Sequence, residues 1–408
     1  MRLLIVGGSV VVGGALVFTA ASALAPPPSN PRPAAAEPAA RPETLQERLK
    51  RLPDDHRSWA RLGVQYVEQA RLTGDPSFYP RAERALATAA ALAPADDTVL
   101  SGRAALAAAR HDFPAAARLA LQAVRANPYG AAAFGVLADA RTQLGDLDGA
   151  HEATERMMAL RPGVAAFTRA SYAAELRGDL TGARRFLEHA LADATAPADL
   201  AYCRTYLGEL ALRSGDLAGA RGWYGQALAA SPGFVPALAG QARAHALAGE
   251  LPAALALYDR ITARLPLPQY LVEQGEVRIK AGLAPDWALL RAQQRLAAEA
   301  GVLDDLTAAE FEADHGDPEL AVRHARAEYG RNPNVVAADA LAWALHRAGR
   351  SREGLPYARK ATAVGWRNAL LQHHRAEIER ALGRPARSRA LEFNPRFDPA
   401  LPALARFS

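Results

Sequence analysis

Apolar stretches of the chain are interrupted at a regular interval by a glycine with polar residues beside it. From residue 145 onward these glycines stand 33 to 37 residues apart, and most intervals are 33 or 34 residues. Glycine permits the left-handed backbone turn that ends a helix, so each one predicts a turn between two helices. The chain is therefore expected to be an array of helical repeats. The glycines are Gly145, Gly178, Gly215, Gly249, Gly282, Gly316, Gly349 and Gly383, and His111 holds the same position one interval earlier.

Two further positions of the repeat define its second helix. A small residue that lets two helices approach closely lies five residues after the glycine position, as in Ala150 and Ala183. About twelve residues later a proline follows, which cannot continue a helix. An aspartate directly after several glycines, such as Asp146, is suited to cap the second helix. Each unit is thus expected to be a helix, a glycine turn, a second helix and a proline stop. The other small residues are Ala116, Ala220, Ala254 and Ala321, and the prolines are Pro94, Pro128, Pro162, Pro232, Pro266, Pro333 and Pro395.

This unit resembles the tetratricopeptide repeat, whose first helix carries W-x2-L-G-x2-Y and whose second carries A-x3-F with a late proline. Trp59, Leu62, Gly63 and Tyr66 match the first helix in full. The second helix follows after residues 73–80, which are expected to form a lengthened loop. Further matches are Ala82, Leu86, Ala89 and Pro94, then Leu207, Gly208, Ala220, Tyr224, Ala227 and Pro232, and Gly275. The resemblance implies an all-α fold over residues 43–408: a right-handed α-solenoid of about 9–10 helical hairpins.

Three units depart from the pattern. One carries Trp287 in place of the small residue and lacks the final proline, so we expect irregular packing there. A later unit has Gly354 at that position. The last unit, from about residue 369, reaches Pro395 early, so its second helix should be about a turn short and act as a terminal cap. The tail, residues 393–408, is expected to cover the open end with Phe397, Leu401, Leu404 and Phe407.

Residues 1–25 have the three-part layout of an export signal: Arg2, an apolar stretch over residues 3–18, and small residues up to Ala25. The same stretch is about long enough to span a bilayer, so a cleaved signal peptide and an N-terminal membrane anchor both remain open. Either one predicts that the rest of the chain lies outside the cytoplasm. Residues 26–42, rich in proline and alanine, predict a linker. Thr44 and Glu47 have the spacing of a capping box that opens the first helix.

Composition and motifs argue against catalysis and nucleic-acid binding. The formal charge of the 408 residues is only +5, and charges of both signs are mixed along the chain without a basic stripe. The arginine-rich composition is typical of a GC-rich bacterial genome. The single cysteine, Cys203, excludes an intrachain disulfide and is expected to be a packed thiol. His373, His374 and Glu377 are more typical of a solvated helix than of a metal site. With no hydrolase, phosphate-loop or dinucleotide motif, we expect no enzyme, cofactor or metal.

The resemblance implies that first helices line a concave groove that holds a peptide or a partner's helix. It therefore implies a non-catalytic protein–protein interaction scaffold, with Trp343, His346 and Arg347 as the best single patch. For each candidate an ordinary helix face is the competing interpretation, and for Trp343 it is packing between repeats. An accessory protein or hydrolase acting on envelope material through the same groove is the alternative function. The candidates are Asp139, Gln143, Tyr172, Glu175, Glu209, Arg213, Arg243, Glu276, Glu310, Asp314, Trp343, His346 and Arg347. The sequence names neither the partner nor the oligomeric state.

Overall fold

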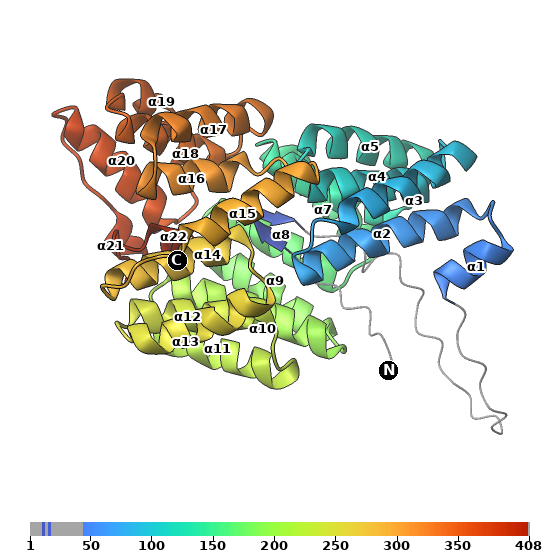
Figure 1. Ribbon diagram of the computed structural model, residues 1–408, viewed down its shortest axis with the longest axis horizontal. Helices are drawn as coiled ribbons and strands as arrows, with labels where there is room; N and C mark the ends of the chain where they lie inside the picture. Colours follow the sequence, from blue (N-terminus) through green and yellow to red (C-terminus); the bar gives the residue numbers. More distant parts are fainter. Residues whose placement is uncertain (1–9, 13–14, 18–43, 407–408) are drawn as a thin grey trace.

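A computed structural model describes residues 10–12, 15–17 and 44–406, and Figure 1 shows helical hairpins wound around a common axis. Ten hairpins follow one another in this part of the chain. The first helices are α2 (His56–Thr73), α4 (Asp97–Ala109), α6 (Ala131–Gln143), α8 (Val164–Leu176), α10 (Pro197–Arg213), α12 (Val235–Leu247), α14 (Pro268–Lys280), α16 (Asp305–His315), α18 (Val335–Arg347) and α20 (Ala369–Ala381). The second helices are α3 (Phe78–Leu92), α5 (Phe113–Ala126), α7 (Leu147–Leu160), α9 (Leu180–Asp193), α11 (Leu217–Ala230), α13 (Leu251–Arg264), α15 (Trp287–Glu299), α17 (Pro318–Arg331), α19 (Ser351–Ala361) and α21 (Ala390–Phe393). Helix α1 (Leu45–Arg51) precedes them, and α22 (Pro402–Ala405) follows.

Two short strands lie near the N-terminus. Strands β1 (Val10–Val12) and β2 (Ala15–Val17) pair in the antiparallel sense, and β2 lies beside α6. Most of the predicted signal or anchor, and all of the predicted linker over residues 26–42, lie outside the described residues. None of the described helices is both long and apolar enough to cross a membrane.

The predicted glycine turns are confirmed at seven of the eight positions, where φ lies between 68° and 82°. His111 adopts the same conformation with φ of 62°, which a side chain with a Cβ rarely does. The prediction is wrong at Gly316, where φ is −134°. There the Glu312 carboxylate accepts a hydrogen bond of 2.8 Å from the backbone N–H of Asp317. Only two residues connect α16 to α17, and this connection needs no left-handed residue.

The rest of the repeat pattern folds as expected. The side chains of Asp146, Asp179 and Asp216 each cap a second helix by accepting a backbone N–H bond of 2.8 to 2.9 Å. The small residues after the glycines are buried, between 0 and 4% exposed. Glycines in the first helices leave room for large side chains of the second, as Gly208 does beneath Tyr224. Thr44 and Glu47 form the predicted capping box of α1.

Three local expectations need correction or refinement. The predicted loop over residues 73–80 is shorter, because α2 continues to Thr73, Gly74 ends it with φ of 66°, and α3 begins at Phe78. The irregular unit places Trp287 over Gly275, and its second helix α15 buries only Leu290. Helix α21 is a single turn of four residues, shorter than predicted.

The superhelix winds tightly enough for its successive turns to touch. Neighbouring first helices contact one another along the array, so they form the inner layer, and the second helices form the outer one. The indole N–H of Trp366 donates a bond of 3.0 Å to Glu175, 191 residues earlier, and Asn394 donates one of 3.3 Å to the carbonyl of Leu212, 182 residues earlier. About five to six repeats therefore complete one turn. This is an α-solenoid whose successive turns lie against each other.

Candidate functional site

The inner layer carries a series of polar pairs, each joining one first helix to the next. The pairs begin between α6 and α8 and end between α18 and α20. All of them are acid–base pairs except the one between α16 and α18, where the indole N–H of Trp343 donates to Asp314 at 2.7 Å. The acid–base pairs, with their shortest N–O distances, are Asp139–Arg169 (2.7 Å), Glu175–Arg213 (2.8 Å), Glu209–Arg243 (3.1 Å), Arg243–Glu273 (2.8 Å), Glu276–His315 (3.0 Å) and Asp339–His374 (2.8 Å).

Most of the acid–base pairs are buried. The Asp139 and Arg169 side chains are each 4% exposed, and those of Arg243 and Glu273 are 5% and 1%. Burial raises the pKa of Glu209, against the opposing effect of the Arg243 guanidinium. A buried pair contributes little net stability but becomes costly when one partner is removed, by about 3–5 kcal/mol. The pairs therefore specify which helix faces lie together more than they strengthen the fold.

The predicted groove residues lie on this inner layer. Most of them form hydrogen bonds or ion pairs with other residues of the same chain. Besides the paired residues, Gln143 is 4% exposed and accepts from Asn334 through its backbone and side-chain oxygens. Tyr172 is 8% exposed, and burial raises the pKa of its hydroxyl. Of the predicted candidates, Arg347 is exposed, and Asp314, Trp343 and His346 are partly buried. The buried candidates are Asp139, Gln143, Tyr172, Glu175, Glu209, Arg243, Glu276 and Glu310, and the Arg213 side chain is 10% exposed.

Trp343 belongs to an aromatic cluster at the C-terminal end of the inner layer. Its ring stacks on His374 with centroids 4.0 Å apart and on His346 at 5.0 Å. The Arg347 guanidinium lies 5.7 Å from the indole centroid, within the range of a cation–π contact. The predicted patch of Trp343, His346 and Arg347 is therefore brought together, and packing between repeats accounts for much of it.

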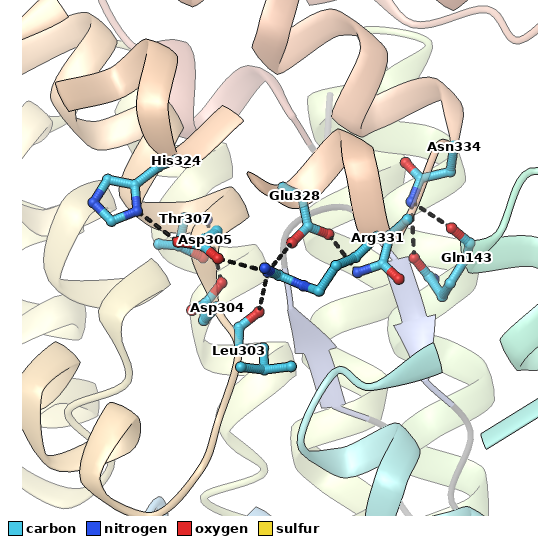
Figure 2. A network of polar contacts seen from close by, with 10 residues as sticks. Gln143, Leu303, Asp304, Asp305, Thr307, His324, Glu328, Arg331 and Asn334 are labelled. Carbon is cyan, nitrogen blue, oxygen red and sulfur yellow. Dashed lines mark hydrogen bonds and ion pairs between the residues drawn. The ribbon is translucent and has the colours of Figure 1, made fainter. Parts of the chain in front are cut away.

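A polar network joins the two turns of the superhelix (Figure 2). Arg331, at the end of α17, donates to Asp305 at 2.6 Å, to Glu328 at 3.2 Å and to the carbonyl of Leu303 at 3.4 Å. Three residues further along the chain, Asn334 bonds to Gln143 on α6. Burial raises the pKa of Glu328 to about 7, because Asn332 and Arg331 offset the loss of water only in part. The network fixes the start of α18 against the end of α6.

The C-terminal segment lies in the concave face instead of merely covering the end of the array. Helix α22 contacts α14 and α20, both first helices. The N–H of Ala403 donates to Glu276 at 2.8 Å, and Arg406 forms an ion pair of 2.8 Å with Glu310. Burial raises the pKa of Glu276 to about 7 and that of Glu310 to about 8, against the opposing effects of His315 and Arg406 respectively. Of the predicted covering residues, Phe397, Leu401 and Leu404 are buried, and Phe407 lies outside the described residues.

Sequence reasoning missed the partners that complete the inner layer. Among them are Arg169, Glu273, Asn334, Trp366 and Arg406. For Arg169 and Glu273 a signal existed, because Asp139–Arg169 and Arg243–Glu273 are oppositely charged residues 30 apart on consecutive first helices. Asn334, Trp366 and Arg406 have no such signal, since their partners lie on another turn of the superhelix or across the groove.

Cys203 and the adjacent histidines His373 and His374 are the other residues that the sequence singled out. Cys203 is fully buried, and burial raises the pKa of its thiol to about 12, which suits a packed, unreactive group. The expectation of a solvated helix is wrong for His374, which is 5% exposed and bonds to Asp339 of α18, and His373 lies 3.9 Å from Glu377. In the part of the chain that the structure describes, no three His, Cys, Asp or Glu side chains are grouped as metal ligands would be.

Comparison with known proteins agrees with this architecture. Residues 211–271, which cover the end of α10 through the start of α14, match the family model described as Tetratricopeptide repeat. Residues 211–271 thus match a tetratricopeptide repeat, and the hairpins on either side of them continue the same helical-repeat architecture. No curated protein matches the sequence.

Solved structures of repeat proteins resemble parts of the chain. A thermophilic TPR protein of Thermus thermophilus is 22% identical, with a TM-score of 0.40, and the match covers 45% of this chain and 94% of that one. PilW, a type IV pilus biogenesis factor, is 19% identical, with a TM-score of 0.40, covering 55% and 96%. A tetratricopeptide repeat protein of Parabacteroides merdae is 20% identical, with a TM-score of 0.34, covering 54% and 87%. At these identities the likeness concerns the fold alone.

Proposed function

We propose that this chain is a non-catalytic scaffold of a bacterial cell that binds a peptide or partner protein on the concave face of its solenoid. The observation that carries the proposal is the C-terminal segment in that face. A backbone N–H, an arginine and two buried leucines of a non-repeat segment all have partners on first helices. A surface that holds one segment by main-chain and side-chain contacts is suited to hold another.

The proposal is tested by crosslinking the purified protein to the material it meets in its own cell, followed by mass spectrometry. Crosslinks to a partner on first helices, such as at Lys280 of α14, are expected. Crosslinks at Lys360, which lies on the second helix α19, serve as the comparison. Partner crosslinks confined to second helices would contradict the proposal.

We further propose that the chain acts outside the cytoplasm. The support is the signal-like pattern of residues 1–25, and the cleaved and anchored forms remain two versions of the same proposal. Residues 1–43 fused to a reporter enzyme that is active only outside the cytoplasm should give activity. Replacing two residues of the apolar stretch by arginine should abolish it, and an active reporter in that variant would contradict the proposal. Fractionation then separates a released reporter from a membrane-bound one.

A further inference from the structure

The end of the chain leaves the repeat pattern and crosses the concave face. Helix α21 ends at Phe393, and residues 394–401 run back to α22 without following the 34-residue repeat. Leu401 and Leu404 are fully buried, in one apolar cluster with Leu238 of α12 and Tyr270 of α14. Ala403 belongs to a second cluster, with Leu271 of α14 and Phe311 of α16. The segment therefore lies across several first helices and prolongs none of them.

Polar contacts hold the same segment at regular positions of the repeat. Glu276 and Glu310 each stand six residues before a glycine of the repeat, on successive first helices. One accepts the Ala403 N–H at 2.8 Å, and the other pairs with Arg406 at 2.8 Å. Asn368 also donates to the Arg406 carbonyl at 3.4 Å. Two consecutive repeats thus present carboxylates to a single passing segment.

The segment has the character of a bound peptide. Helix α22 has only four residues, far fewer than an isolated helix needs to be stable in water, so its order depends on the face it contacts. The Glu310 and Arg406 side chains are 10% and 9% exposed, and a purely structural cap could fill this space at lower cost with apolar side chains. A buried ion pair favours a segment that carries a positive charge at this position. Such a preference for one type of side chain is typical of a surface that binds a specific peptide.

We propose that the concave face of α12, α14 and α16 is a binding groove for a partner segment that carries two apolar side chains three residues apart and an arginine two residues later. The chain's own residues 401–406 have this pattern and occupy the groove in cis. This inference rests on the proposed function and adds the chemistry of the partner and its competition with the tail. A tethered segment has a local concentration in the millimolar range, so a partner must displace it or bind when it is released.

The test uses a fluorescent peptide of residues 399–406 and the chain truncated after Asp398, which keeps the ion pair between Lys280 and Asp398. The truncated chain should bind the peptide at least tenfold more tightly than the full chain does, because the cis segment no longer competes. Peptides with Leu401→Ala, Leu404→Ala or Arg406→Ala should each bind at least tenfold more weakly. Fluorescence anisotropy measures the affinities, and circular dichroism confirms that the truncated chain stays helical.

A charge exchange makes the test specific to Glu310. The truncated chain with Glu310→Arg should lose binding of the native peptide and regain it with the Arg406→Glu peptide. Glu188→Arg, on the exposed side of α9, is the matched control and should change nothing. If truncation reduces helicity, the full chain with Leu401→Asp and Leu404→Asp releases the segment without shortening the chain, and it should bind the peptide in the same way.

Three results would overturn the inference. One is a folded, tail-free chain that does not bind the peptide, or that binds it regardless of Arg406. Another is a full-length dimer, seen by analytical ultracentrifugation, that dissociates on truncation, because the groove would then belong to the tail of a second copy. A partner that crosslinks to first helices without competition from the peptide would also refute the inference, while leaving the proposed scaffold function intact.

Discussion

The side-chain amide of Asn334 donates a 2.9 Å hydrogen bond to the carbonyl oxygen of Gln143, although 191 residues separate them. The same Asn334 caps α18 by accepting bonds of 2.9 Å from the N–H groups of Val336 and Ala337. One side chain thus starts a helix on one turn of the superhelix and ends a helix on the previous turn. Contacts of this kind make the solenoid close on itself.

Asn334→Asp separates the two roles of this residue. The variant keeps the capping oxygen but loses the amide donor and directs a carboxylate at the Gln143 carbonyl. We expect a loss of about 1–3 kcal/mol in unfolding free energy, as for a buried hydrogen bond left unmade. Hydrogen exchange should become faster at the end of α6 and stay unchanged at Val336 and Ala337. Faster exchange at the start of α18 alone would show that capping was the only role.

Gly178→Ala and Gly349→Ala form a matched pair for the contact between turns. Both glycines have positive φ, 81° and 77°, so alanine strains the backbone at either position by about 1–2 kcal/mol. A Cβ at Gly178 would lie 2.5 Å from the carbonyl oxygen of Gly365 on the next turn, whereas a Cβ at Gly349 would meet nothing within 4 Å. Gly178→Ala should therefore cost at least about twice as much, measured by urea unfolding. Equal losses of unfolding free energy in the two variants would mean that the backbones of the two turns are not in close contact at Gly178.

Asp139→Ala tests the pairs of the inner layer. Removing the aspartate leaves the Arg169 guanidinium buried without its partner, and a loss of about 3–5 kcal/mol is expected. The double variant Asp139→Leu and Arg169→Met should recover most of that loss. Asp148→Ala, which removes the fully exposed partner of Arg177, should leave the unfolding free energy almost unchanged. Failure of the double variant to recover stability would show that the charges themselves strengthen the fold.

Glu328→Gln should change how stability depends on pH. The pKa of Glu328 is raised from 4.5 to about 7 in the folded chain, so the folded state holds this proton more tightly than the unfolded state. The contribution of this group to the unfolding free energy is fully present below pH 4.5. It is lost as pH rises from 4.5 to 7, by up to about 3 kcal/mol. The stability of the wild type relative to the glutamine variant should fall over that range in thermal unfolding. A constant difference between the two proteins would contradict the raised pKa.

The repeat could be predicted because its determinants are local. A glycine turn, an aspartate cap, a small contact residue and a proline stop all act within one hairpin, and such a hairpin contacts mainly its neighbours. The two predictions about the repeat that failed also concern single hairpins. At Gly316 a side chain of the preceding helix closes the turn, and in the last unit the second helix shrinks to one turn.

The predicted groove residues lie on first helices, but the environment of their side chains was not foreseen. The prediction assumed an open groove, in which the inner face is exposed to solvent. The sequence gives no sign that the successive turns of this solenoid touch or that the C-terminal segment lies in the groove. Charges such as Asp139 and Arg243 were interpreted as partner-binding side chains because their own partners stand on neighbouring repeats. Arg406 was missed because a tail without the repeat pattern has no predictable position along the array.

The sequence by itself determined the hairpins, their order and the layer in which each first helix lies. The tertiary structure alone decided the pitch of the superhelix, and with it the contacts of Gly178 with Gly365 and of Trp366 with Glu175. Pitch is the sum of small rotations between successive repeats. No single residue encodes it, and a small change in each rotation, multiplied over five to six repeats, separates an open groove from one filled by its own chain.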